Sequence, residues 1–175
     1  VRGAVRSDGD ARGLDQLLHD SRLHALLDEL DTTLWYRPHP LAEQDIRGLG
    51  GRVRLATNDA LEADGLLFYE ALGSADVLVT DYSSVWIDHL LTDRPMLAFC
   101  PDLDLYRAGR GLALEPHDAW FPGPVVQDVE EFFGQLERAL RDPGADAARR
   151  ADRRRLLHAG ATDPVARTWD CLEAR

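Results

Sequence analysis

The chain has 175 residues, of which 45% are hydrophobic and 7% aromatic, and it carries a formal net charge of −11. This length and composition indicate one globular domain with a real core, and they exclude a disordered chain or two domains of normal size. The negative charge argues against nucleic acid as a partner, because such a partner needs a basic surface that neutralises phosphates.

The start of the chain and its cysteines bear on where the protein works. The chain begins with Val1 and its only methionine is Met96, which indicates either a start codon other than ATG or a piece of a longer protein. The N-terminal region lacks the apolar core of a signal peptide, and no run approaches membrane-spanning length. Cys100 and Cys171 are far apart and fit no zinc spacing. We therefore expect a cytoplasmic protein with free thiols, and peripheral attachment to the inner membrane face stays open.

The first part of the chain predicts a helix followed by two strands. Residues 1–13 are polar and rich in Gly, Asp and Arg, and we interpret them as a flexible lead-in. Apolar residues recur at helical spacing from Leu14 to Leu30. Two β-prone runs follow, with two prolines after the first and a glycine turn before the second. The predicted elements are a strand at Thr32–Tyr36, a short helix at 41–47 and a strand at Val53–Ala56.

The rest of the chain alternates between helical and strand patterns and then becomes helical. The predicted strands are Asp76–Thr80 and Pro95–Phe99. The predicted helices are 65–74, Ser84–Thr92, 128–141, 145–158 and 164–174, with an irregular stretch before Pro124.

This alternation predicts an α/β domain over residues 14–175, with a Rossmann-like parallel sheet covered by helices on both faces. Ligands of such sheets bind at the carboxyl ends of the strands. Pro38-His39-Pro40 and Asp81-Tyr82-Ser83-Ser84 each follow a predicted strand. We therefore expect these two segments to lie at the same edge of the sheet.

Ser83 and Ser84 stand between a predicted strand and a predicted helix. Hydroxyls and free backbone N–H groups at such a position suit a phosphate, which the helix dipole also favours. The alternative is an ordinary helix N-cap, a role for which serine is well suited. Asp81, at the tip of the strand, could orient the loop or a ligand hydroxyl, or act as a cap itself.

His39 differs from the other histidines because flanking prolines fix its backbone at the presumed ligand edge. A rigidly held imidazole can act as an acid, a base or a donor to phosphate.

Two Asp-x-Asp triplets, Asp8–Asp10 and Asp102–Asp104, have a spacing that is common by chance in so acidic a chain. We therefore predict no metal and no cofactor. The remaining histidines are interpreted as surface or structural residues: His19, His24, His89, His117 and His158.

Taken together, these segments resemble the CDP-glycerol glycerophosphotransferase family, the teichoic acid primases and polymerases of bacterial cell walls. The family's basic-x-His-Pro element is matched by Arg37–Pro40, and its Asp-Tyr-Ser-Ser segment is matched by Ser74–His89. Three further elements follow in the family's order. They are an Arg-Pro strand at Arg94–Leu97, an Asp-Leu-x-x-Tyr pattern at Asp102–Arg107 that leads to Arg110-Gly111, and Pro122-Gly123-Pro124.

The resemblance implies a GT-B fold, in which two Rossmann-like halves enclose the active site. It matches this chain to the C-terminal half, which holds the CDP portion of the donor. It implies that Ser83 and Ser84 bind the diphosphate and that His39 contacts the phosphoryl group under attack. The implied reaction moves glycerol phosphate from CDP-glycerol to a hydroxyl of a teichoic-acid-type polymer and releases CMP. The matched motifs also assign to the donor site Pro40, Thr80, Asp81, Tyr82, Asp88, Arg110 and Gly111.

Two family features have no match in this chain. One is a second histidine, in a Trp-His-Gly element of the other half, that resembles a general base; the other is the first strand of this half's sheet. We therefore expect a donor-binding unit that does not turn over alone and that meets a lipid-linked polymer acceptor through another domain. Two alternatives stay open. One is a GT-B glycosyltransferase that uses a nucleotide sugar, and the other is a non-catalytic nucleotide-binding module that self-associates along an exposed sheet edge.

Overall fold

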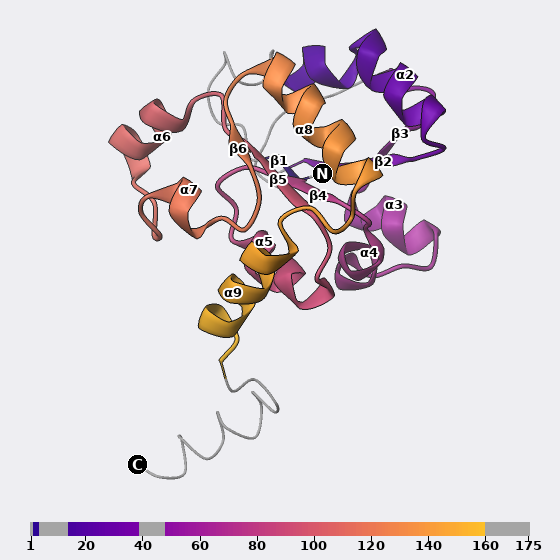
Figure 1. Cartoon of the computed structure of the whole chain (residues 1–175). Coiled ribbons are helices and arrows are strands. Elements are labelled where there is room, and N and C mark those ends of the chain that lie inside the picture. The colour runs from indigo at the N-terminus through magenta and orange to yellow at the C-terminus, as the bar shows by residue number, and fades with distance from the viewer. Residues whose placement is uncertain (1, 4–13, 39–47, 160–175) are drawn as a thin grey trace.

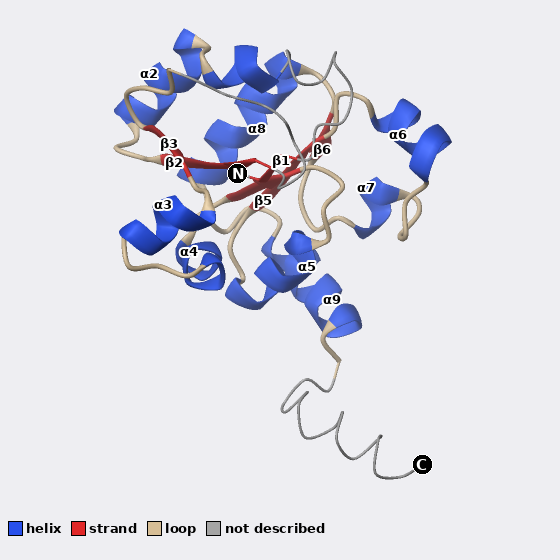
Figure 2. Ribbon diagram, turned by 180° about the vertical axis from the view of Figure 1, so that it is seen from behind, coloured by secondary structure: helices blue, strands red, loops and turns tan. Residues whose placement is uncertain are grey.

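A computed structural model describes residues 2–3, 14–38 and 48–159 of the chain (Figure 1). A parallel sheet lies in the middle, with helices on both of its faces (Figure 2). This is the α/β architecture that the sequence predicts. The strands are β1 (Arg2–Gly3), β2 (Leu34–Pro38), β3 (Val53–Leu55), β4 (Leu78–Thr80), β5 (Met96–Phe99) and β6 (Val125–Val126).

The helices form two layers and a small group at one end of the sheet. Figure 2 shows α2 (Ser21–Glu29) and α8 (Val129–Arg141) on one face. The opposite face carries α3 (Asn58–Ala63), α4 (Phe68–Ser74), α5 (Val85–His89) with the 3-10 turn Leu90–Thr92, and α9 (Ala147–Leu157). Beyond β6 lie α6 (Leu103–Arg110) and α7 (His117–Trp120).

The strand order is that of a Rossmann fold. β1 pairs with β2 and β2 with β3, while β4 pairs with β5 and β5 with β6, and all four pairings are parallel. These pairings make two three-stranded groups, β1-β2-β3 and β4-β5-β6, and because β1 also contacts β4, the strands lie in the spatial order β3-β2-β1-β4-β5-β6. In sheets of this order the chain reverses direction across the sheet between the first and fourth strands, and ligands bind outside the carboxyl ends at that point.

The first strand, expected to be missing, is present but very short. Arg2 lies opposite Arg37 and Gly3 opposite Pro38, so β1 pairs only with the last two residues of β2. The expectation of an absent strand is therefore corrected: a strand of two residues pairs with the carboxyl end of β2. The other residues of the predicted lead-in, 4–13, lie outside the described residues.

Most predicted elements are confirmed, and the differences have local causes. The helix predicted from Leu14 to Leu30 is interrupted at Asp20, whose side chain accepts a hydrogen bond from the Arg22 amide at 2.8 Å and begins α2 there. Thr57 begins α3, a helix that was not predicted, by accepting a hydrogen bond from the Ala60 amide at 3.2 Å. The stretch predicted to be irregular before Pro124 contains α6 and α7. The helices predicted at 41–47 and 164–174 lie outside the described residues.

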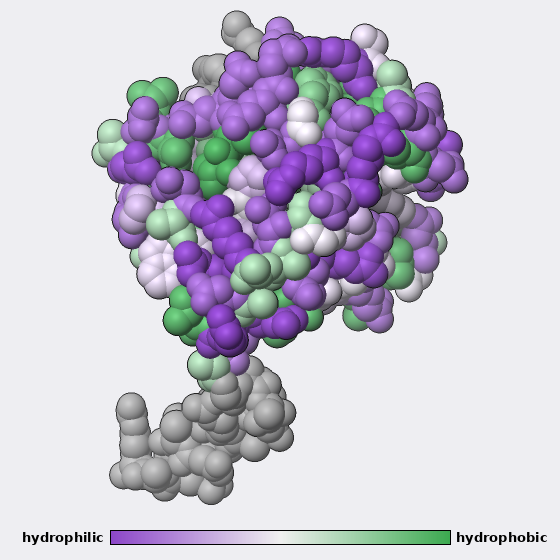
Figure 3. Space-filling model, viewed as in Figure 1, coloured by the Kyte–Doolittle hydropathy of each residue, from purple (hydrophilic) through white to green (hydrophobic). Residues whose placement is uncertain are grey.

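Two apolar clusters fill the space between the sheet and its helices, one on each face. Successive residues of a strand point to opposite faces, so Val79 belongs to one cluster and Leu78 to the other. Such two-sided burial is typical of inner parallel strands. The view in Figure 3 shows a largely hydrophilic outer surface with separate apolar patches, as a charge of −11 suggests. The first cluster includes Leu18, Leu23, Leu27, Leu97 and Leu136, and the second includes Trp86, Leu90, Met96, Ala98 and Phe121.

Gly123 packs directly on β5, which gives the central glycine of Pro122-Gly123-Pro124 a structural role. A Cβ at this position would lie 1.9 Å from the Met96 carbonyl oxygen. We predict that Gly123→Ala lowers the free energy of unfolding by about 3 kcal/mol, because backbone atoms must move apart. Gly134→Ala is the control, since a Cβ in that part of α8 meets nothing within 4 Å and alanine favours a helix. Urea denaturation of both variants measures this, and equal midpoints would contradict it.

His89 is fully buried, and burial lowers its pKa to about 4. In the unfolded chain a histidine has a pKa near 6.5, so the unfolded state binds more protons between pH 6.5 and 4. We predict that stability is complete above about pH 6.5 and falls by about 3 kcal/mol as the pH drops to 4.

The variant His89→Leu removes this titrating group, and His19→Gln, at an exposed position, is its control. Urea denaturation between pH 4 and 7.5 should give a shallower pH dependence for His89→Leu alone. The same slope in all three proteins would show that His89 does not cause the acid sensitivity.

Candidate functional site

The loop from Asp81 to Ser84 connects β4 to α5 and is shaped by its own aspartate. Asp81 is buried, and its Oδ1 accepts a hydrogen bond from the Ser83 amide at 2.9 Å. Ser83 Oγ is 3.5 Å from the Val85 amide, which makes it a weak cap. Ser84 is exposed and its side chain makes no capping hydrogen bond. The Asp81 turn therefore holds the loop, and the Ser84 hydroxyl is not used as the helix cap that the alternative hypothesis required.

Tyr82 joins this loop to α6. Its hydroxyl donates a hydrogen bond to Asp102 Oδ1 at 2.6 Å, and its ring stacks on Tyr106 with a centroid separation of 3.8 Å. Burial raises the pKa of Tyr82, with Asp102 as a second cause, so the hydroxyl stays protonated at neutral pH. Sequence reasoning did not include Asp102 and Tyr106 among the site residues, although both lie in the Asp-Leu-x-x-Tyr pattern that it recognised.

The structure gives Asp102 and Asp104 roles other than metal binding. Asp102 accepts the Tyr82 hydrogen bond, and Asp104 pairs with Arg107 at 3.3 Å on the outside of α6. Within the described ranges, no group of three or more His, Cys, Asp or Glu side chains could hold a metal ion.

The carboxyl end of β2 lies at the same edge as the Asp81–Ser84 loop. Burial raises the pKa of Tyr36 to about 12, and the nearby charge of Asp81 adds to the shift. The side chain of Arg37 donates hydrogen bonds to the Ala56 carbonyl at 2.8 Å and to Asn58 Oδ1 at 2.6 Å, so it fastens β2 to the start of α3. His39 and Pro40, which follow β2 in the sequence, lie outside the described residues.

The remaining predicted site residues surround the loop to different degrees. Thr80, the last residue of β4, is buried, and its hydroxyl has no hydrogen-bond partner among the described residues. Asp88 is exposed, one helical turn after Ser84. Arg110 is exposed at the last position of α6, and Gly111, with φ of 71°, ends that helix. No hydrogen bond or ion pair of the described residues joins Arg110 or Gly111 to the serine loop.

This edge can bind an anion through neutral hydrogen-bond donors. The loop follows β4 directly, beside the point where the strand order reverses, which is where ligands of such sheets bind. The Ser84 side chain is exposed and that of Ser83 is half-buried, while the carboxylates of Asp81 and Asp102 are already engaged as acceptors. The described part of the loop therefore offers binding groups, and the carboxylates of Asp81 and Asp102 serve its internal structure.

The strand order is that of a Rossmann-like α/β domain, and the polar loop lies where such domains bind their ligands. The chain belongs to the CDP-Glycerol:Poly(glycerophosphate) glycerophosphotransferase family, whose sequence model matches residues 6–160. It is 31% identical to the teichoic acid ribitol-phosphate primase of Bacillus spizizenii over 74% of this chain and 31% of the relative. It is 26% identical to the teichoic acid glycerol-phosphate primase of Bacillus subtilis over 66% of this chain and 28% of the relative.

The fold is also that of a solved structure, the wall teichoic acid polymerase TagF. The TM-score is 0.61 with 22% identity, over 87% of this chain and 37% of that chain. The expected Rossmann-like half of a GT-B fold is thus confirmed. The chain spans about a third of the length of the relatives that it matches. In the described residues no helix is long and apolar enough to cross a membrane.

Asp81 should be required for the shape of the serine loop. We predict that Asp81→Ala, which removes the acceptor of the Ser83 amide, lowers the free energy of unfolding by about 1–3 kcal/mol. Asp81→Asn retains an acceptor oxygen and should lose less. Amide hydrogen exchange at Ser83, together with urea denaturation, measures both effects. Equal exchange rates in the two variants would show that the Asp81 acceptor does not hold the turn.

Proposed function

We propose that this chain is the donor-binding part of a glycerophosphotransferase. In this reaction glycerol phosphate moves from CDP-glycerol to a hydroxyl of a teichoic-acid-type polymer, and CMP is released. The observation that carries the proposal is the Asp81–Ser84 loop at the reversal point of the sheet, in a chain of this family. The relatives named as teichoic acid primases support the same class of reaction.

In this proposal Ser83 and Ser84 bind the diphosphate of the donor through their hydroxyls and backbone amides. Hydrogen bonds to a charged phosphate are stronger than those between neutral groups. Asp81 fixes the loop backbone, and the bond from Tyr82 to Asp102 holds the loop against α6. Thr80, the last residue of β4, belongs to the same donor-binding residues.

The other side of the donor site is proposed to come from the segment after β2 and from the end of α6. His39, directly after Pro38, contacts the phosphoryl group under attack, and Pro40 fixes its backbone. Arg110 and Gly111 line the same cleft. The guanidinium of Arg110 is exposed and forms no ion pair with a described residue, so it is free to bind a phosphate oxygen. Asp88, one helical turn after Ser84 on α5, is the last of the proposed donor-site residues.

The chemistry requires a base, and the carboxylates of Asp81 and Asp102 already accept hydrogen bonds within the protein. An acceptor hydroxyl oxygen attacks the phosphorus that carries glycerol, the bond from that phosphorus to the CMP oxygen breaks, and the hydroxyl proton goes to a base. Phosphoryl transfer depends mainly on positioning and on stabilising charge at the phosphoryl oxygens. We propose that this chain supplies those functions and that the base and the lipid-linked polymer acceptor meet it through another domain, at the cytoplasmic face of the membrane.

Replacing the two serines tests the proposal. We predict that Ser83→Ala and Ser84→Ala each weaken CDP-glycerol binding about tenfold, because a hydrogen bond to a charged group is lost. Ser74→Ala is the control, since that hydroxyl donates to the Ala71 carbonyl at the end of α4. Calorimetric titration with CDP-glycerol, CDP and a UDP-sugar measures all three proteins. Tighter binding of the UDP-sugar would favour a nucleotide-sugar glycosyltransferase, and no binding of any nucleotide would contradict the proposal.

A further inference from the structure

Helix α6 is attached to the rest of the domain by few side chains. Of its eight residues Leu103 is buried and Tyr106 is half-buried, while the other six are exposed. Figures 1 and 2 show the helix at the outside of the molecule, beyond β6. Leu103 belongs to the apolar cluster of Trp86 and Phe121. Because the last turn of α6 contains no buried residue, its orientation depends on the contact that Tyr106 makes.

That contact is a stack on Tyr82, the tyrosine of the Asp81–Ser84 loop. The two ring centroids lie 3.8 Å apart and the rings are 19° from parallel. The Tyr82 hydroxyl also donates to Asp102 Oδ1 at the N-cap of α6, at 2.6 Å. On α7, the His117 ring lies 6.2 Å from the Tyr82 ring. The side chain of Tyr82 therefore ties the loop to α6 at two points.

Arg110, the last residue of α6, lies on the same face of the helix as Tyr106. Residues four apart on a helix are neighbours, with their Cβ atoms about 5–6 Å apart. The other arginine of this helix, Arg107, pairs with Asp104 at 3.3 Å and with Glu115 at 3.1 Å. Arg110 is exposed and forms no ion pair with a described residue. The face of α6 that contacts the serine loop thus ends in a guanidinium that is free to bind an anion.

Packing for stability alone does not account for the place of Tyr106. A residue that only anchors the helix would enter the apolar cluster, as Leu103 does. The Tyr106 ring instead covers Tyr82, which packs at the border of that cluster and precedes Ser83 in the chain. Aromatic pairs have preferred geometries, so a stacked ring fixes the direction of a helix better than an aliphatic contact does. The stack therefore links the orientation of α6 to the serine loop.

We propose that Tyr106 is a positioning residue of the donor site: its stack on Tyr82 sets the orientation of α6 and directs Arg110 toward the anion bound by the serine loop. The loop offers neutral donors, so Arg110 adds a positive charge, and its guanidinium can bind two phosphate oxygens at once. This inference rests on the proposed function, because it assigns the second side of the same anion site. Tyr106 does not touch the ligand, so its effect on binding acts through Arg110.

A double-mutant cycle on the 175-residue chain tests this inference. Calorimetric titration with CDP-glycerol compares Arg110→Gln, Tyr106→Leu and the protein that carries both substitutions. We expect each single substitution to weaken binding about tenfold and the double variant to bind within about twofold of Arg110→Gln, because Tyr106 acts through that residue. Tyr106→Phe retains the stacked ring and should bind like the unmodified chain. Leu105→Ala, at a position that is 75% exposed, is the control.

A second experiment moves the charge and leaves the ring in place. Arg110→Gln combined with Ala108→Arg keeps the net charge and the position in the last turn, but it places the arginine on another face of α6. Binding should stay about tenfold weaker, since the stack holds the helix in one orientation. Because Tyr106 is unchanged, this variant tests the inference even where Tyr106→Leu alters folding.

Three results would overturn the inference while the unmodified chain still binds CDP-glycerol. Losses that multiply to about a hundredfold in the double variant would show that Tyr106 does not act through Arg110. Full binding with the relocated arginine would show that the orientation of α6 is not fixed. Full binding by Arg110→Gln would remove Arg110 from the site. No binding by the unmodified chain would contradict the proposed function, and this inference with it.

Discussion

The two halves of the parallel sheet are joined through two residues of β1. Inner strands of such a sheet need both faces covered by apolar side chains and both edges paired. The faces are covered by two separate clusters, and β1 pairs with the last two residues of β2 and contacts β4. β1 is thus the strand at which the two halves of the sheet meet. The Asp81–Ser84 loop follows β4 directly, so its position depends on this contact.

The serine loop separates the groups that maintain its shape from the groups that face solvent. Asp81 accepts the Ser83 amide, and Tyr82 donates to Asp102 on the next βα unit, so both side chains are engaged within the protein. Ser84 has no such role and is exposed. A serine that capped α5 would have its hydroxyl occupied by a backbone amide, and it would be less able to bind a phosphate. The internal bonds of Asp81 and Tyr82 therefore leave the Ser84 hydroxyl accessible to a ligand.

The sequence predicts the elements whose patterns are local. The apolar runs of β4 and β5, the 3.6-residue spacing of α8 and the Ser-Ser segment after β4 are all visible without coordinates. The helix break at Asp20 and the start of α3 at Thr57 depend on single capping hydrogen bonds, which periodicity does not detect. The contact from Tyr82 to Asp102 joins residues twenty positions apart and follows from packing alone. The length of β1 depends on its register with β2, which no pattern within the chain specifies.

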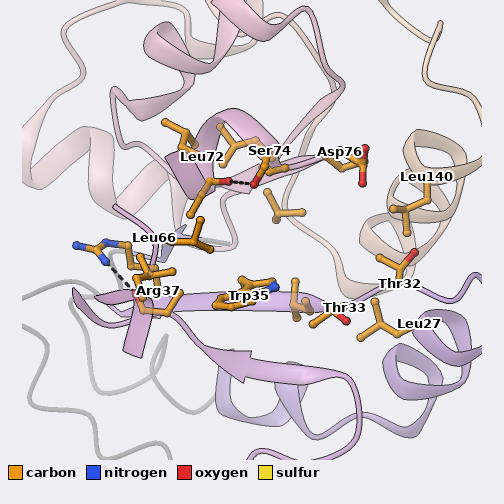
Figure 4. Close-up of a pocket in the computed structure, with 18 of the residues that line it drawn as sticks. Leu27, Thr32, Thr33, Trp35, Arg37, Leu66, Leu72, Ser74, Asp76 and Leu140 are labelled. Carbon is orange, nitrogen blue, oxygen red and sulfur yellow. Dashed lines mark hydrogen bonds between the residues drawn. The ribbon is translucent and has the colours of Figure 1, made fainter. Parts of the chain in front are cut away.

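The candidate site and the interior of the sheet are coupled because they share β4. That strand has three residues: Leu78 and Val79 line a cavity of about 390 Å³ (Figure 4), and Thr80 leads directly into Asp81. Atoms beside a cavity lack packing partners on that side, so local movement of β4 costs less than global unfolding. Ser83 and Ser84 follow this strand in the sequence, so a ligand that orders the serine loop also restricts β4 and loses that entropy on binding.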